Sequence, residues 1–361
     1  MDIQSSSDNP FRVLAAGDRF ITSSLFASEV KSRLGSRAAI AEIELPWPDE
    51  AFHAVAEVHE ASGDEDLMIK ALDGIQAIVT QLAPLTERVL NESPELRFIG
   101  VSRGGPTNVN VEAAVRRGIT VVNVPGRNGI ATAEMTLGLI LAVIRRIPLT
   151  QATLTNHEWR GDFYRATEVG MEISGATVGI IGAGAVGKHV ASVLTAMGAH
   201  VLVYDPYATE GALAGIATLV GDLDDLFRRS SLVSVHARLS PETANLISPE
   251  RIALMPRGSY VVNSARGGLV NYDAVVQSLR SGHLAGAAFD VFPSEPVDFG
   301  HPLFGLLAEG FNVVVTPHIA GASRQTAVRA ASGTAEELRR FLDGLPPMNP
   351  LGGIKPEVAL R

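Results

Sequence analysis

Short apolar runs alternate with helical segments along most of the chain, and this alternation limits the possible fold more than any other feature. A first series of runs occupies residues 12–16, 38–45, 77–80, 97–101 and 120–124. A second series occupies residues 177–181, 200–204, 232–236, 259–263, 286–291 and 312–316. Continuous apolar strands separated by helices are typical of parallel sheets that are buried on both faces. The pattern predicts two α/β domains, each built on a doubly wound parallel sheet.

The same pattern predicts where the domains begin and end. Residues 126–318 are expected to form one domain. A helix predicted at residues 324–342 lies too far along the chain to belong to that sheet and is expected to cross back to the other domain, which then consists of residues 11–125 plus 319–345. Residues 131–147 are apolar on nearly every side, which indicates a helix that is buried all round. This helix is expected to lie either in the core or against a second subunit.

Composition narrows the class of protein. The chain has 361 residues, of which 46% are hydrophobic, and this suits two domains with sizeable cores. A net charge of −9 without a basic cluster argues against nucleic acid as a partner. The absence of cysteine fits a reducing compartment. We predict a cytoplasmic protein, since the start has no signal-peptide pattern and no apolar run approaches membrane-spanning length. We predict no metal site, since metal ligands are not clustered.

A glycine motif follows the first strand of the second series. Gly182, Gly184 and Gly187 form G-x-G-x-x-G between this strand and an apolar-periodic helix. The first glycine permits a tight turn, the second lets the backbone approach a pyrophosphate, and the third lets helix and strand pack closely. The helix N-terminus offers N–H donors to the phosphates. This context predicts a dinucleotide site.

Asp205 ends the next strand, at the spacing where an acidic residue binds the ribose hydroxyls of a dinucleotide. A carboxylate at this position repels a 2′-phosphate, so the sequence favours NAD over NADP. The alternative is that Asp205 is an ordinary turn residue before Pro206.

Three ionisable residues follow later strands of the second series: Arg266, Glu295 and His318. The carboxyl ends of parallel strands meet at one edge of a sheet, so these side chains are expected to reach one crevice. Histidine suits the protonation of an alkoxide, a carboxylate orients it and raises its pKa, and arginine binds a substrate carboxylate. The set is the one that reduction of a 2-oxo acid requires. Each residue also has a purely structural alternative. Arg266 bridges to the sheet edge, Glu295 is a solvated loop acid, and His318 caps the final helix.

Several motifs resemble the D-isomer-specific 2-hydroxyacid dehydrogenase family, which includes phosphoglycerate dehydrogenases and glyoxylate/hydroxypyruvate reductases. They are VGIIGAGAVG, YDP, HARLSPETANLI, NSARGGLVN, GAAFDVFPSEP and TPHIAG. The resemblance runs from about residue 101 to residue 323. It implies two domains of Rossmann and flavodoxin-like type with a cleft between them, NAD as cofactor and a small 2-oxo or 2-hydroxy acid as substrate. It also implies a homodimer formed through the helix near 131–147.

The resemblance implies individual roles as well. Arg266 binds the 2-oxo acid, and His318 is the acid and base that Glu295 orients. Formate dehydrogenases of the same superfamily have glutamine in place of this glutamate, so Glu295 argues against formate oxidation. Further cofactor contacts are expected at Ala185, Val186, His236, Ala265 and Asp290. For His236 and Asp290 the alternatives are a strand-end histidine and a structural acid with satisfied hydrogen bonds.

The substrate is expected to meet the loop that begins at residue 101. The candidates are Arg103, Gly104 and Gly105, together with Gln81 and the neighbouring Leu82. Arg103 either binds a distal phosphate or carboxylate of the substrate or is a surface arginine. Arg238 stands where the family more often has proline, and the sequence assigns it no role.

A second class of function shares these motifs. Dehydrogenase-fold corepressors bind NAD(H) as sensing scaffolds and keep much of the same catalytic set. The complete set of arginine, glutamate and histidine favours an enzyme. A hydrolase is disfavoured because the chain has no cysteine and no clustered metal ligands such as H-E-x-x-H.

Overall fold

The computed structural model describes residues 9–352. Residues 1–8, which form most of the start without a signal-peptide pattern, lie outside the described residues. The chain divides into two compact units. Within the described residues, the first unit comprises residues 9–127 and 322–352, and the second unit comprises Asn128–Gly321.

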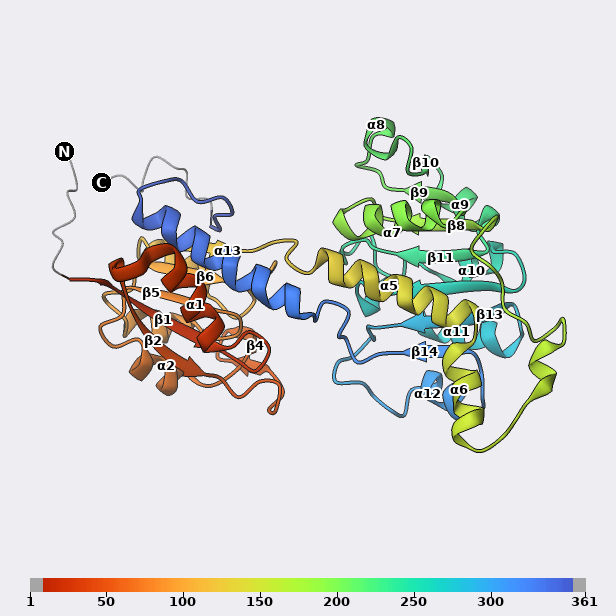
Figure 1. Ribbon diagram of the computed structural model, residues 1–361, viewed down its shortest axis with the longest axis horizontal. Helices are drawn as coiled ribbons and strands as arrows, with labels where there is room; N and C mark the ends of the chain where they lie inside the picture. Colours follow the sequence, from red (N-terminus) through yellow and green to blue (C-terminus); the bar gives the residue numbers. More distant parts are fainter. Residues whose placement is uncertain (1–8, 353–361) are drawn as a thin grey trace. The chain divides into compact units, whose positions relative to one another are not determined.

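The first unit is built on a five-stranded parallel sheet. Its strand order is β2 (Ala38–Glu44), β1 (Phe11–Gly17), β5 (Ala77–Thr80), β6 (Phe98–Val101) and β7 (Thr120–Asn123). Helices α1 (Ser23–Leu34) and α13 (Arg324–Leu342) cover one face, and the other carries α2 (Glu65–Ala71), α3 (Glu87–Asn91) and α4 (Val111–Arg116) (Figure 1). This strand order, in which β1 lies between β2 and β5, is the order of the flavodoxin-like fold.

A small antiparallel hairpin, β3 (His53–Val55) and β4 (Val58–Ala61), lies outside this sheet. The sequence analysis did not predict it. Its strands are short and largely exposed, so they lack the apolar run that indicates a buried strand. The hairpin brings Glu60 to the loop after β6, as described below.

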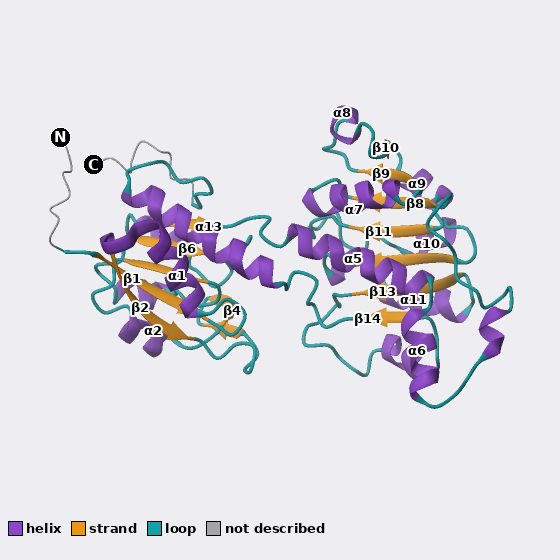
Figure 2. Cartoon of the chain, viewed as in Figure 1, coloured by secondary structure: helices purple, strands orange, loops and turns teal. Residues whose placement is uncertain are grey.

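The second unit is built on a seven-stranded parallel sheet (Figure 2). Its order is β10 (Thr218–Leu219), β9 (His200–Tyr204), β8 (Thr177–Ile181), β11 (Leu232–Val235), β12 (Ser259–Asn263), β13 (Leu284–Phe289) and β14 (Val313–Val315). Helices α5 (Gly129–Ile144) and α7 (Ala185–Ala196) cover one face, and the other carries α9 (Leu223–Arg229), α10 (Pro249–Leu254), α11 (Tyr272–Arg280) and α12 (Pro302–Ala308). The remaining elements are η1 (Gly35–Arg37) in the first unit and α6 (Ile147–Thr155), η2 (Gly161–Tyr164), α8 (Glu210–Leu213) and η3 (Gly267–Leu269) in the second. This is the Rossmann order with one added strand, and it confirms the predicted α/β class.

The helix predicted at residues 131–147 needs two corrections. It ends at Ile144, because Arg146 adopts a left-handed conformation (φ 55°) before α6 begins. It is also not buried all round within the chain: Met135, Leu137 and Leu141 are only half-buried. The periodicity of the sequence shows that these side chains are apolar but not what covers them.

Candidate active site

The glycine motif forms the turn between β8 and α7. Gly182 has φ 98°, a conformation that glycine adopts freely. A Cβ atom at Gly187 would lie 1.9 Å from the carbonyl oxygen of Gly182, so only glycine allows this close packing. A Cβ atom at Gly184 would meet nothing within 4 Å, which leaves room for a pyrophosphate at the backbone. Ala185 and Val186 open α7, whose first N–H groups point toward that space.

Asp205 follows β9 and is half-buried. Its Oδ2 atom accepts a hydrogen bond from Ala183 N–H at 2.7 Å, and Oδ1 accepts from Tyr207 N–H at 2.8 Å. The carboxylate therefore ties the glycine turn to the end of β9, a role that spacing alone did not indicate. Each oxygen keeps a lone pair for a further donor, so the arrangement is compatible with ribose hydroxyls.

Glu295 and His318 contact each other directly, through Oε2 and Nδ1. The second carboxylate oxygen of Glu295 accepts from Phe292 N–H at 3.0 Å, which fixes the carboxylate. The hydrogen bond that His318 donates to Glu295 raises the pKa of His318 above its ordinary value, against the effect of burial. Burial acts to raise the pKa of Glu295, but the hydrogen bonds from His318 and from Phe292 N–H together lower it. The pair therefore favours a charged imidazolium beside a carboxylate.

Arg266 is exposed at the end of β12, and its charge lowers the pKa values of both Glu295 and His318. Two hydrogen bonds of Asn263 shape the turn before it: Nδ2 donates to Arg266 O at 2.8 Å and Oδ1 accepts from Ala265 N–H at 2.9 Å. A Cβ atom at Gly267 would lie 1.9 Å from Phe292 O, so glycine lets the loop of Arg266 approach the loop of Glu295.

Asp290 holds the turn that carries His318. It is fully buried, and its carboxylate accepts from Thr316 Oγ1–H at 2.5 Å, Ile319 N–H at 3.0 Å and Ala320 N–H at 2.8 Å. His318 itself has φ 54°. A non-glycine residue in this region costs roughly 1–2 kcal/mol, and such strain persists where the surroundings enforce it. These contacts match the alternative of a structural acid; a cofactor contact of Asp290 stays a prediction.

The other predicted residues of the second unit lie at strand ends. Burial lowers the pKa of His236 to about 4, so its ring is neutral at pH 7, and Nε2 lies 3.0 Å from Ser234 Oγ. Ala265 lies directly before Arg266 and is half-buried. Arg238 is exposed, and its carbonyl oxygen accepts from Thr243 Oγ1–H at 2.6 Å.

The predicted substrate residues of the first unit follow β5 and β6. Gln81 is buried, and its Oε1 has no hydrogen-bond partner among residues 9–352. Gly104 and Gly105 are exposed, and a Cβ atom at Gly105 would meet nothing within 4 Å. The Arg103 side chain forms an ion pair with Glu60 and is 20% exposed, so it is not a free surface arginine.

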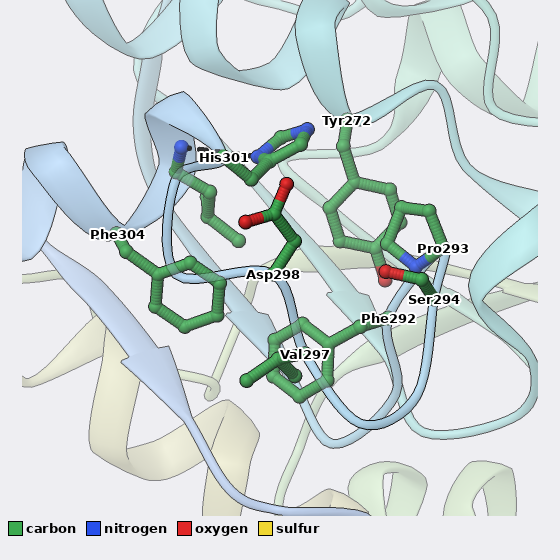
Figure 3. Close-up of a pocket in the computed structure, with 9 residues that line it drawn as sticks. Tyr272, Phe292, Pro293, Ser294, Val297, Asp298, His301 and Phe304 are labelled. Carbon is green, nitrogen blue, oxygen red and sulfur yellow. Dashed lines mark hydrogen bonds between the residues drawn. The ribbon is translucent and has the colours of Figure 1, made fainter.

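A pocket borders the loop that carries Glu295 (Figure 3). Its lining is Tyr272, Phe292, Pro293, Ser294, Val297, Asp298, His301, Leu303 and Phe304. The rings of Tyr272, Phe292 and Phe304 make it largely aromatic, and Arg266, Glu295 and His318 do not line it. The pocket therefore contacts the loop that carries Glu295 but not the side chains of the three charged residues.

Sequence reasoning missed the residues that position the predicted groups. They are Glu60 beside Arg103, Asn263 and Gly267 beside Arg266, and Thr316 beside Asp290. The motif NSARGG contains Asn263 and Gly267, but nothing in a single sequence tells that Gly267 contacts the loop of Glu295. Within residues 9–352, no group of three or more His, Asp or Glu side chains is arranged to hold a metal ion. No helix in this described part is long and apolar enough to span a bilayer.

Comparisons with known proteins agree on one family. Residues 137–320 match the family model described as D-isomer specific 2-hydroxyacid dehydrogenase, NAD binding domain. The chain is 38% identical over 282 residues to the D-3-phosphoglycerate dehydrogenase of Mycobacterium tuberculosis, an alignment that covers 78% of this chain and 52% of that protein. The enzyme of that name from Methanocaldococcus jannaschii is 36% identical over 321 residues, covering 85% and 59%. The chain thus spans little more than half the length of these curated relatives.

Solved structures show the same fold over nearly the whole chain. The TT0316 protein from Thermus thermophilus superposes with a TM-score of 0.74 at 31% identity, covering 95% of this chain and 100% of that one. The NAD-complexed D-isomer specific 2-hydroxyacid dehydrogenase of Lactobacillus delbrueckii superposes with a TM-score of 0.75 at 24% identity, covering 94% and 100%. The second likeness bears on the fold alone.

Proposed function

The chain belongs to the D-isomer-specific 2-hydroxyacid dehydrogenase family, and on this premise we propose that it transfers a hydride between NAD and C2 of a small D-2-hydroxy or 2-oxo acid. Membership confirms the family indicated by the motifs. It also confirms NAD as the cofactor, because the matched model describes an NAD-binding domain. The observation that carries the proposed activity is the contact of His318 with Glu295 in a loop cluster that also holds Arg266.

The cofactor is assigned to the glycine turn and the adjoining strand ends. We assign the pyrophosphate to Gly182, Gly184, Ala185, Val186 and Gly187, where the backbone is open at Gly184 and the N-terminus of α7 begins. Asp205 is assigned to the ribose, and the remaining contacts to His236, Ala265 and Asp290. Bound there, NADH supplies the hydride for reduction, and NAD⁺ accepts it in oxidation.

His318 moves the proton that the reaction requires. Glu295 occupies the Nδ1 side of the ring, so Nε2 is left to face the substrate oxygen. In the reductive direction, the imidazolium donates its Nε2 proton to the oxygen at C2 as charge develops there. The Nδ1 proton stays on His318 throughout, donated in a hydrogen bond to the Glu295 carboxylate, which fixes the ring. In the oxidative direction, neutral Nε2 accepts the hydroxyl proton.

Arg266 is assigned to the substrate carboxylate and the C2 oxygen. Its guanidinium is a planar fork that suits a carboxylate, and its positive charge stabilises negative charge at the C2 oxygen. We assign further substrate contacts to Gln81, Arg103, Gly104 and Gly105 of the first unit. The exposed backbone of the two glycines can offer N–H donors.

We also propose that the protein is a homodimer. Met135, Leu137 and Leu141 are only half-buried on α5, and Ile147 and Leu154 of α6 are 49% and 58% exposed. Apolar side chains gathered on neighbouring helices are typical of an interface. A mass near twice 38.1 kDa in sedimentation experiments is expected, whereas a monomer at micromolar concentration would contradict the proposal.

Loss of NADH absorbance with a panel of 2-oxo acids tests the activity. The panel contains glyoxylate, hydroxypyruvate, phosphohydroxypyruvate, pyruvate and longer sugar-derived acids, and each is repeated with NADPH. Turnover of at least one member with NADH is expected. NADH binding without turnover across the panel would favour a sensing scaffold instead.

A further inference from the structure

The charge of Arg103 is already balanced within the first unit. Arg103 forms its ion pair with the carboxylate of Glu60, and Nη1 lies 3.4 Å from the carbonyl oxygen of the same residue. The Arg103 side chain is 20% exposed and that of Glu60 is 42% exposed. A partly buried pair of this kind is less screened by solvent than a surface pair.

Glu60 is held in place by its backbone. His59 N–H donates to Thr107 O at 2.9 Å, and Ser62 N–H donates to Leu82 O at 2.9 Å. These bonds join the β3–β4 hairpin to the loop after β6 on one side of Glu60 and to the turn after β5 on the other. Glu60 has φ 50°, a left-handed conformation that glutamate rarely adopts. Backbone strain that the surroundings enforce is characteristic of functional positions.

Arg103 is held just as firmly. Val124 N–H donates to Arg103 O at 3.1 Å, and Asn123 Nδ2 donates to Gly104 O at 2.9 Å. The loop follows β6 of a parallel sheet, the end at which such sheets bind ligands. Its glycine backbone is exposed while the guanidinium is turned to Glu60.

Arg127 is a second arginine close to Arg103, and it also has a carboxylic acid nearby. Arg127 donates through Nε to the carbonyl oxygen of Ser102, and burial and the charge of Arg103 lower its pKa to about 10. Asp18, whose charge acts on Arg127, is buried and accepts from Phe20 N–H at 2.8 Å. Each of these two arginines therefore has a carboxylic acid close to it within the first unit.

We propose that Glu60 is a specificity-determining residue, which neutralises Arg103 so that the enzyme prefers 2-oxo acids with an uncharged distal end over those ending in phosphate or carboxylate. The inference rests on the proposed function, since it assigns Arg103 to the substrate. A distal phosphate would have to displace Glu60 from Arg103 or lie beside its carboxylate, and like charges in contact are strongly unfavourable.

Hydroxypyruvate and phosphohydroxypyruvate test this, because they differ only by the distal phosphate. NADH oxidation is followed at constant ionic strength for the wild type, Glu60→Gln and the control Glu57→Gln. The control removes one charge from the same hairpin, where Glu57 accepts from Asn110 Nδ2 at 2.8 Å rather than contacting Arg103. We expect the wild type to prefer hydroxypyruvate in kcat/KM by on the order of tenfold or more.

Glu60→Gln is expected to raise kcat/KM for phosphohydroxypyruvate by about tenfold, mainly through KM, because Arg103 becomes available. Adding Arg103→Gln to this variant should remove the gain, and Glu57→Gln should leave the ratio of the two substrates unchanged. A wild type that prefers phosphohydroxypyruvate would overturn the inference and leave the dehydrogenase intact. An unchanged ratio in a folded, NADH-binding Glu60→Gln variant would overturn it too. Silence of the wild type with every acid of the panel would instead overturn the proposed function, and this inference with it.

Discussion

Gly267 approaches Phe292 so closely that a Cβ atom would lie 1.9 Å from the Phe292 carbonyl oxygen. The contact joins the loop of Arg266 to the loop of Glu295, and backbone cannot yield as a flexible side chain does. Gly267→Ala is therefore expected to reduce the free energy of unfolding by about 1–3 kcal/mol and to lower turnover. Denaturant unfolding and NADH oxidation measure the two effects.

Gly211→Ala is the control, since Gly211 is exposed on α8 and a Cβ atom there would meet nothing within 4 Å. Its stability is expected to stay within about 0.5 kcal/mol of the wild type. A Gly267→Ala variant as stable and as active as this control would contradict the inferred need for close approach.

Replacing His318 should separate catalysis from cofactor binding. His318→Asn removes the group that donates the proton, so turnover is expected to fall by about 10²–10⁴-fold. Fluorescence titration with NADH is expected to give nearly the wild-type Kd, because the glycine turn is unchanged. Wild-type turnover in this variant would remove His318 from the mechanism.

The pH dependence of reduction should report the Glu295–His318 pair. Glu295 raises the pKa of His318 above 6.5, so the protonated form needed for reduction persists above that pH. In Glu295→Gln the alkaline midpoint of reductive kcat/KM is expected to move down toward 6.5. Glu309→Gln, which removes an exposed carboxylate paired with Arg280, should leave the midpoint unchanged. A shift in both variants would point to general surface charge.

Stability should follow the same pair with a definite sign. The contribution of His318, whose pKa is raised, is complete below 6.5 and is lost as pH rises through the raised value. The contribution of Glu295, whose pKa is lowered from 4.5, is lost as pH falls through the lowered value. Unfolding free energies of the wild type and Glu295→Gln should therefore differ most between about pH 5 and 6.5, and the difference should shrink as pH rises through the raised pKa of His318. A constant difference would exclude titration of the pair as its cause.

Asp205 should govern the choice between NADH and NADPH. Asp205→Asn removes the negative charge but keeps one acceptor oxygen for the glycine turn. The preference for NADH, measured as the ratio of kcat/KM values, is expected to fall by on the order of tenfold, since a 2′-phosphate no longer meets a carboxylate. Asp222→Asn, at the start of α9, is the matched control. An unaltered ratio would count against the ribose assignment.

The sequence predicted the longer strands of both sheets because they are apolar runs, but it missed β10, a strand of only two residues whose Thr218 is exposed. It also predicted α13 at the observed residues, Arg324–Leu342. The hairpin of Glu60 was missed, because strands of three and four mostly exposed residues have no such pattern. The early end of α5 was missed as well, since arginine is an unusual residue for the left-handed conformation of Arg146.

The site could be predicted only in part, because some of its contacts join residues that are far apart in the sequence. The glycine motif and the three charged residues are local signals at strand ends. The pair of Arg103 with Glu60 joins residues separated by 43 positions, and a single sequence does not show that they meet. The sequence motifs indicate which charged residues are present. The partners of these residues, such as Glu60 for Arg103, determine how the charges act in the folded protein.

Helix α13 belongs to the first unit but follows the second unit in the sequence. The two units therefore complete their cores at different times during synthesis. Ala330, Ala331 and Leu338 of this helix fill the core of the first unit, beside Phe26 and Val30 of α1. The second unit is contiguous, Asn128–Gly321, and all of it leaves the ribosome before α13 does. The first unit, whose strands are translated first, must therefore wait with only α1 covering that face of its sheet until α13 has been translated. Its neighbour, translated later, is the first that can complete its own core.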